Sequence, residues 1–308
     1  MPPWRYVDRN GAGANPPSGG AGAAGAKPGG MSAFLRHLAA CNNHPGLHTL
    51  RPWRIDGAVA GYLAPAHAAA LAALPGWHQA GAALELVAPA EARSATLAAA
   101  AAALGARNRR ELFDVRHRPE GPSLAVLDRG AIPVFGVIGQ GVHVNGLVRR
   151  ADGLHVWVGW RSKTKSVAPG QLDNLVAGGT PAGLSAFECL VKEAEEEASI
   201  PAALARQAVP VAKVSYVMQV PEGTRRDVMH IFDLELPPDF TPQPNDDEVE
   251  RFELWPIDRL FAQVRDAGAT EVKFNVNLAL CDLFLRQGLL DPASAEGVAL
   301  RQGMQRAV

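Results

Sequence analysis

Four glutamates fall within the five residues from position 193 to position 197. In a helix through this region, Glu193, Glu196 and Glu197 share one face of the last turn. Carboxylates at this end oppose the helix dipole by about 0.3–1 kcal/mol each, and neighbouring like charges repel by about 0.2–0.5 kcal/mol per pair. A divalent cation such as Mg²⁺, which prefers carboxylate and water oxygens, would relieve this repulsion. The alternative is a solvated acidic face.

The surrounding residues predict the helix that carries these carboxylates. Ser185, followed three residues later by Glu188, is a capping-box pattern for the helix start. Pro201 disfavours the α conformation in the residue before it, so the helix should end near Ala198. Lys192 can neutralise only part of the negative charge. The apolar face has helical spacing at Phe187, Leu190, Val191 and Ala194.

Residues 178–200 resemble a Nudix box, whose pattern is Gly, five residues, Glu, seven residues, then Arg-Glu-aliphatic-any-Glu-Glu-any-Gly-aliphatic. The matching residues are Gly178, Glu193, Ala194, Glu196, Glu197 and Ile200, with Lys192 in place of the Arg. Leu184 replaces the first Glu of the pattern, and Ser199 replaces its last Gly. The resemblance implies that Glu193, Glu196 and Glu197 bind the metal and take part in catalysis. It also implies Mg²⁺ as the cofactor, with Mn²⁺ as an alternative.

Three basic residues, Arg161, Lys163 and Lys165, precede the glycine loop at a spacing of two. If the chain stays extended here, all three side chains point the same way, and such a row suits the negative oxygens of a diphosphate. The alternative is a solvated basic loop. Together with Gly178 and Gly179, these residues form the predicted substrate-binding set.

An acidic segment at residues 246–255 offers a further carboxylate. In many Nudix enzymes a carboxylate from a late loop or strand completes the metal site or acts as general base. Glu248 and Glu250 are the candidates, and Glu248 is preferred because it lies nearer the loop. The alternative for either residue is a charged loop ahead of an amphipathic strand.

A longer string is similar to the Nudix subfamily related to the Nudix portion fused to fungal thiamine pyrophosphokinases. It comprises residues 160–163, 169–170, 172–174 and 176–179. Members carry a small domain ahead of the Nudix domain, and the resemblance covers residues 33–290. It implies hydrolysis of thiamine diphosphate, or its oxidised analogues, to the monophosphate. The alternatives are 8-oxo-dGDP or another nucleoside diphosphate as substrate, and a non-catalytic module that binds a diphosphate.

The expected fold class is α+β, a Nudix α/β/α sandwich with a mixed sheet, preceded by a small α+β domain. The predicted boundaries are a disordered tail at 1–30, the small domain at 31–133, the Nudix domain at 134–290 and a C-terminal tail at 291–308. Alternating patterns and turn signals predict hairpins at 142–158 and 211–236, and the subfamily resemblance implies an opening hairpin of the small domain at 48–63. Helices are predicted at 95–106 and 275–286.

Two other groups of side chains can serve either chemistry or structure. The first is His37, Cys41, His44 and His48, at spacings that zinc ligands can take. The segment Asn-Asn-His-Pro does not resemble a zinc-finger knuckle, so we do not expect zinc there. The second is Trp157, Trp160 and Tyr216, which can stack on a substrate ring but more often fill the core of a sheet.

The chain has 308 residues, which is long enough for two domains, and its composition agrees with a two-domain enzyme. The net charge is −1, from 30 basic and 31 acidic residues, so we expect no nucleic-acid partner. No apolar run approaches the ~20 residues that span a bilayer, so we expect no membrane partner. The three dispersed cysteines indicate a reducing compartment, and we expect a cytoplasmic monomer or homodimer that acts on a small-molecule diphosphate.

Overall fold

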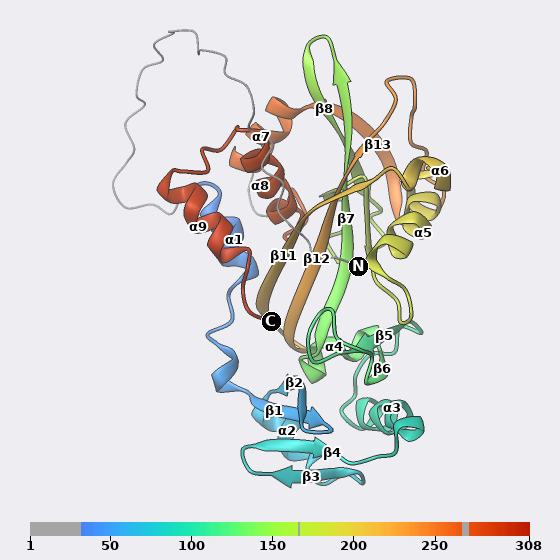
Figure 1. Ribbon diagram of the computed structural model, residues 1–308, viewed down its shortest axis with the longest axis vertical. Coiled ribbons are helices and arrows are strands. Elements are labelled where there is room, and N and C mark those ends of the chain that lie inside the picture. Colours follow the sequence, from blue (N-terminus) through green and yellow to red (C-terminus); the bar gives the residue numbers. More distant parts are fainter. Residues whose placement is uncertain (1–31, 166, 267–270) are drawn as a thin grey trace. The chain divides into compact units, whose positions relative to one another are not determined.

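The computed structural model describes residues 32–165, 167–266 and 271–308 (Figure 1). Contacts join Ser32–Val308 into one unit. The predicted disordered tail at 1–30 lies outside the described residues. In the part of the chain that is described, no helix is long and apolar enough to cross a membrane.

A mixed sheet with the strand order β11-β12-β7-β8-β13 forms the largest element of the structure. Its strands are β7 (Ile138–Arg150), β8 (Gly153–Arg161), β11 (Val209–Val220), β12 (Gly223–Glu235) and β13 (Val249–Pro256). β12 runs parallel to β7, whereas the other neighbours in this order are antiparallel. The predicted hairpins at 142–158 and 211–236 are therefore confirmed as β7–β8 and β11–β12.

The strand β7 changes its partner halfway along its length. Near its start it pairs with β10 (Val176–Gly179), in the register Val144↔Val176 and Gly141↔Gly179. Further along it pairs with β8, beginning at Gly146↔Trp157. The short strand β9 (Leu172–Asp173) pairs with β8 instead. This change of partner places β10, which carries Gly178 and Gly179, in the sheet beside β7.

Alternation along the strands gives the sheet two apolar faces. Val156 and Val158 of β8 belong to one core cluster, and Trp157 between them belongs to the other. α5 (Ala186–Ala198) and α6 (Ala202–Ala205) pack in the cluster of Trp157, whereas α7 (Ile257–Asp266) and α8 (Val276–Arg286) pack in that of Val156. Figure 1 shows the two pairs of helices on either side of the sheet. The expected sandwich and the closing helix at 275–286 are confirmed.

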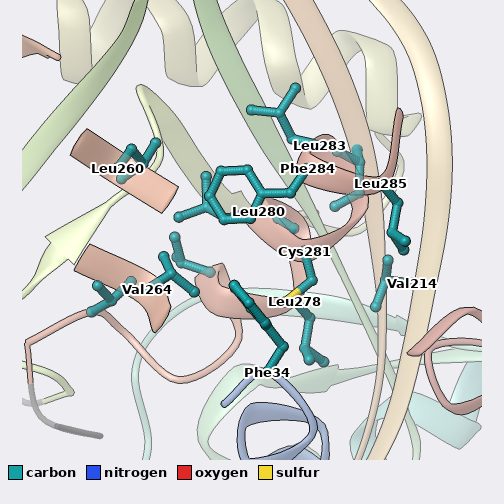
Figure 2. Close-up of a cluster of buried hydrophobic side chains, with 14 of the residues drawn as sticks. Phe34, Val214, Leu260, Val264, Leu278, Leu280, Cys281, Leu283, Phe284 and Leu285 are labelled. Atoms are coloured by element: carbon teal, nitrogen blue, oxygen red, sulfur yellow. The ribbon is translucent and has the colours of Figure 1, made fainter. Parts of the chain in front are cut away.

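The first described residues pack against the C-terminal helices. Phe34, just ahead of α1 (Leu35–Cys41), is 3% exposed and meets Phe284 edge-on at 6.3 Å between ring centroids (Figure 2). Ser32 Oγ donates to Glu296 Oε1 at 2.5 Å, next to the start of α9 (Ala295–Gly303). Residues 32–41, which sequence reasoning assigns to the small domain, thus join the core of the Nudix sheet. The predicted tail at 291–308 contains α9.

A smaller sheet with the order β2-β1-β4-β3 precedes the large one. Its elements are β1 (Arg51–Ile55), β2 (Ala58–Leu63), α2 (Pro65–Leu71), β3 (Trp77–Ala80), β4 (Ala83–Leu86) and α3 (Arg93–Ala103). A hairpin of β5 (Leu112–Val115) and β6 (Ala125–Asp128) and the turn α4 (Ile132–Phe135) follow. Three 3-10 turns lie at Leu47–Thr49, Ala90–Ala92 and Arg129–Ala131. These elements share a core that reaches from Trp53 to Val137, and the predicted division at residue 133 stays a prediction.

Candidate active site

The helix α5 begins with the predicted capping box and ends at Ala198 as expected. The Ser185 Oγ accepts from the Glu188 backbone N–H at 3.2 Å, and Glu188 Oε2 accepts from the Ser185 N–H at 2.9 Å. Leu190 and Ala194 are buried as the spacing predicts, but Phe187 is 37% exposed and is not part of the buried face. Its ring centroid lies 6.2 Å from that of Phe232 on β12.

The three predicted metal-binding glutamates occupy different environments on α5. Glu197 is only 5% exposed, and its Oε2 accepts from the Ala177 N–H of β10 at 3.0 Å. The Glu193 side chain is 16% exposed and lies over Gly178, where an added Cβ would stand 2.6 Å from its Cγ and Cδ. Glu196 is 51% exposed. Glu193 and Glu197 therefore line the edge of β10, and Glu196 faces outward.

The surroundings of Glu193 and Glu197 disfavour their negative charge. Burial raises the pKa of Glu197 well above its usual value, the Ala177 N–H opposes this, and the charges of Asp173, Glu193 and Glu248 add to it. Burial likewise raises the pKa of Glu193, against the nearby Lys192. A bound divalent cation would reverse this effect, because an opposite charge favours the ionised carboxylate.

The donor set fits an oxygen-coordinated cation, although the side chains do not converge on one point. In the residues that the structure describes, no three His, Cys, Asp or Glu side chains are grouped so as to hold a metal ion. Lys192 lies among the carboxylates instead, donating to Glu193 Oε1 at 3.2 Å and to Glu196. Carboxylate oxygens are suitable ligands for a hard cation such as Mg²⁺. Binding by Glu196 would require it to leave Lys192.

The predicted basic row does not form, because the chain turns after Arg161. The Lys165 N–H donates to the Ser162 carbonyl at 3.2 Å, which closes a turn where an extended segment was expected. The Arg161 side chain is 10% exposed and points inward: Nη1 donates to Asp173 Oδ2 at 2.5 Å, and Nε and Nη2 donate to the Val167 carbonyl at 3.2 and 3.0 Å. These contacts favour a positioning role for Arg161, and its direct contact with phosphate stays a prediction.

Glu248, one of the two predicted general bases, contacts the turn at residues 162–165. Lys165 Nζ lies 2.6 Å from Glu248 Oε1, and the Ser162 N–H donates to the Glu248 carbonyl at 2.9 Å. The charge of Glu248 contributes to the raised pKa of both Glu193 and Glu197, so Glu248 lies near enough to interact electrostatically with both carboxylates. Glu250 sits at a register shift of β13 and accepts from the Lys163 N–H at 3.2 Å. This arrangement favours Glu248 over Glu250 as the general base.

Behind the glutamates lies a buried ion cluster that sequence reasoning missed. Asp173 Oδ2 accepts from Lys273 Nζ at 3.0 Å as well as from Arg161. Burial opposes ionisation of Asp173, but the charges of Lys273 and Arg161 hold the pKa of its carboxyl below the usual value. Asp173 belongs to the sequence string before the glycine loop, so a local pattern pointed to this residue. Lys273 is 100 residues away, and no local pattern points to it.

A chain of amides and a histidine continues this cluster between β7 and β10. The His143 Nδ1 lies 2.8 Å from Asn174 Oδ1, and its Nε2 lies 3.4 Å from Asn275 Nδ2. Asn174 Nδ2 donates to Asn145 Oδ1 at 2.9 Å. Burial, with the nearby charge of Lys273, lowers the pKa of His143 to about 4. The imidazole is therefore neutral, with Nδ1 as the donor to Asn174.

The remaining candidate groups have structural roles. His37 Nε2 lies 2.9 Å from the Val264 carbonyl, and Cys41 Sγ donates to the Phe274 carbonyl at 3.4 Å. Trp157 and Tyr216 are buried in the two cores, and Trp160 packs beside one of them.

Comparison with known proteins assigns the large sheet and its helices to one class. Residues 139–274 match the family model of the NUDIX domain. Nudix hydrolase 20, chloroplastic, from Arabidopsis thaliana is 41% identical over 197 residues, which cover 64% of this chain and 52% of that protein. Nudix hydrolase 24, chloroplastic, from the same plant is 42% identical over 186 residues, which cover 60% and 50%. The crystal structure of DR0079 from Deinococcus radiodurans is 20% identical with a TM-score of 0.41, and the match covers 64% of this chain and 100% of that one.

The family-model match and the two plant relatives confirm a Nudix domain at residues 139–274, and the structure has the expected α+β mixed-sheet architecture. The chain spans about half the length of the curated relatives that it matches. The thiamine-related subfamily, the roles of the site residues, the oligomeric state and the cytoplasmic location stay predictions.

Proposed function

We propose that this chain is a divalent-cation-dependent hydrolase that cleaves an organic diphosphate to the monophosphate and phosphate. The observation that carries the proposal is the pair of carboxylates Glu193 and Glu197 beside Gly178, whose burial raises both pKa values. Such a pair is costly in a metal-free protein and useful in one that binds a cation. The two relatives named as Nudix hydrolases support the reaction class.

The cation is Mg²⁺, with Mn²⁺ as its alternative, and Glu193, Glu197 and Glu196 would hold it. When bound, it supplies screening of the diphosphate charge and a lower pKa for an attacking water. Glu196 would serve as a ligand after it releases Lys192, whose ammonium would then be free to donate to a phosphate oxygen. Gly178 and Gly179 stay in the proposed substrate-binding set, and because they carry no side chain they leave room for Glu193 and Phe113 beside the site.

The chain's own residues supply the other parts of the reaction. Lys163 and Lys165 hold phosphate oxygens through charge-assisted hydrogen bonds. Arg161 positions the loop that carries these lysines through its bonds to the Val167 carbonyl. Glu248 accepts the proton of the attacking water, and its electrostatic interaction with Glu193 and Glu197 supports this role. The water oxygen forms a new P–O bond as the bridging P–O bond breaks, and the bridging oxygen leaves on the monophosphate or on phosphate.

Thiamine diphosphate or its oxidised analogues are the proposed substrates. The support is the resemblance of residues 160–179 to the subfamily related to fungal thiamine pyrophosphokinase fusions. Oxidised nucleoside diphosphates such as 8-oxo-dGDP are the second candidate class. A module that binds diphosphates without turnover is the rival function, and Leu184 and Ser199 are the departures from the Nudix pattern that it would explain.

The test is hydrolysis of a panel of diphosphates with Mg²⁺, read by mass spectrometry of the products. The panel contains thiamine diphosphate, its oxidised forms, 8-oxo-dGDP and ADP-ribose. Glu197→Gln removes the buried carboxylate, and Glu195→Gln is the matched control because Glu195 is exposed on the same helix. Turnover that is lost only in Glu197→Gln supports the hydrolase. Binding without turnover by the wild type would overturn it in favour of the binding module.

A further inference from the structure

A cavity of about 410 Å³ lies between the β5–β6 hairpin and the Nudix domain. The hairpin side contributes Phe113 and Asp114, and the sheet contributes Gln140 of β7 and His230 of β12. The loop and first turn of α5 contribute Leu184 and Glu188. The volume is in the range of small-molecule sites, which are commonly built where two domains meet.

The cavity adjoins the edge of β10 that carries the candidate metal ligands. Phe113 lies over Gly179, where an added Cβ would stand 2.5 Å from its Cζ, while Gly178 lies against Glu193. Thr180, which lines the cavity, lies two residues after Gly178, or about 6.6 Å along the extended chain at the end of β10. One organic diphosphate can therefore place its phosphates at Glu193 and its organic group in the cavity.

The cavity wall offers neutral hydrogen-bonding groups. His230 Nε2 lies 2.9 Å from Gln140 Oε1, and Gln140 Nε2 donates to the Pro119 carbonyl at 3.0 Å. These bonds fix the Gln140 amide and orient the imidazole. Burial, with the nearby charge of Lys213, lowers the pKa of His230 to about 4, so the ring is neutral near pH 7.

The charges that line the cavity sum to a small negative value. Arg116 pairs with Asp114 at 2.7 Å, and Asp114 also accepts from the Gly183 N–H at 3.2 Å. Glu188, held in the capping box, is the carboxylate that this pairing leaves uncompensated. An additional phosphate is disfavoured here, and a neutral or positively charged group is favoured.

We propose that this cavity binds the organic group of the diphosphate substrate and selects neutral or cationic heteroaromatic rings over further phosphates. The inference rests on the proposed hydrolase function and deepens it. Phe113 gives the ring an aromatic wall, Leu184 gives it an apolar contact, and Gln140 with His230 gives it hydrogen bonds. The apolar residue at position 184, where the Nudix pattern has Glu, then belongs to substrate selection.

Leu184→Trp tests the inference by filling the cavity, and Leu112→Trp is the matched control, because Leu112 is 52% exposed and does not line the cavity. Hydrolysis of thiamine diphosphate, ADP and methyl diphosphate is measured, the last as a substrate without a ring. For the ring-bearing substrates that the wild type hydrolyses, we expect Leu184→Trp to raise KM by about 10-fold or more. KM for methyl diphosphate and the thermal unfolding midpoint should not change. An equal KM in wild type and Leu184→Trp for every substrate would overturn the inference.

A second variant tests the charge preference, and a binding assay separates the inference from the hydrolase proposal. Glu188→Gln retains a capping residue and should reduce the preference for thiamine diphosphate over ADP, whereas an unchanged ratio would overturn the charge argument. If the wild type hydrolyses no diphosphate, the proposed function fails. Saturation-transfer NMR with thiamine and adenosine then tests the cavity alone. Signals that Leu184→Trp removes support it, and signals equal in wild type and variant, or absent from both, overturn it.

Discussion

The side chain of Glu193 lies directly on Gly178, so that the backbone of β10 and the helix α5 touch at the predicted metal site. A Cβ at position 178 would stand 2.8 Å from Glu193 Oε2. Gly178 does not have a positive φ, so its backbone conformation does not require glycine. Glycine is needed here because a side chain would collide with Glu193. The first residue of the Nudix pattern and its first helix glutamate therefore form one structural unit.

Gly178→Ala should displace the Glu193 carboxylate and reduce Mg²⁺-dependent hydrolysis by about 100-fold, since shifts of about 1 Å at a reacting centre have costs of this size. Circular dichroism should show an intact fold. The double variant Gly178→Ala/Glu193→Gln tests the mechanism through a mutant cycle. It should be no less active than Glu193→Gln alone, and additive losses would mean that position 178 acts by another route.

Ser199→Gly should stabilise the protein. Ser199 ends α5 in the left-handed conformation with φ of 53°, which glycine adopts without the strain that a Cβ introduces. Its Oγ also donates to the Gln243 carbonyl at 3.0 Å, so Ser199→Ala is the control that loses the same bond. In urea titrations, Ser199→Gly should exceed Ser199→Ala by about 1 kcal/mol in free energy of unfolding. Equal values would show that the conformation at 199 stores no strain.

His143 should make the fold sensitive to mild acid. Its pKa is about 4 in the folded protein, against an ordinary value of 6.5 for the unfolded chain, so the unfolded chain takes up a proton first as the pH falls. The stability that neutral His143 contributes is complete above pH 6.5 and is lost as the pH falls towards 4, by on the order of 3 kcal/mol. His143→Gln should make the free energy of unfolding fall less steeply between pH 6.5 and 4, leaving the contribution of His230, whose pKa is also lowered to about 4. A profile as steep as that of the wild type would contradict the neutral tautomer.

Lys273→Met should destabilise the protein by about 3 kcal/mol, because it removes one partner of the buried carboxylate of Asp173. Urea titration measures the loss, and Asp173→Asn/Lys273→Met should recover part of it. Because a buried positive charge near Glu197 is removed, divalent cations should bind more tightly to Lys273→Met than to the wild type. Weaker binding would show that Lys273 supports the site instead of opposing a cation.

Sequence reasoning succeeded where neighbouring residues determine the structure. The Ser185–Glu188 capping box spans three residues, and its hydrogen bonds form as the pattern predicts. It missed the turn after Arg161, which directs this side chain to the Val167 carbonyl and to Asp173. The contribution of Lys273 depends on a contact across 100 residues. Contacts between residues so far apart in sequence form only in the folded protein. The alternation or helical spacing of neighbouring residues does not predict them.

The most direct test is Mn²⁺ binding, followed by electron paramagnetic resonance, to the wild type, Glu197→Gln and Glu195→Gln. If Glu193 and Glu197 hold the catalytic cation, Glu197→Gln should bind Mn²⁺ at least about 10-fold more weakly than the wild type. Glu195→Gln, altered at an exposed position of the same helix, should bind as the wild type does. Equal Mn²⁺ affinity in all three proteins would contradict the assignment of the cation to this pair of carboxylates.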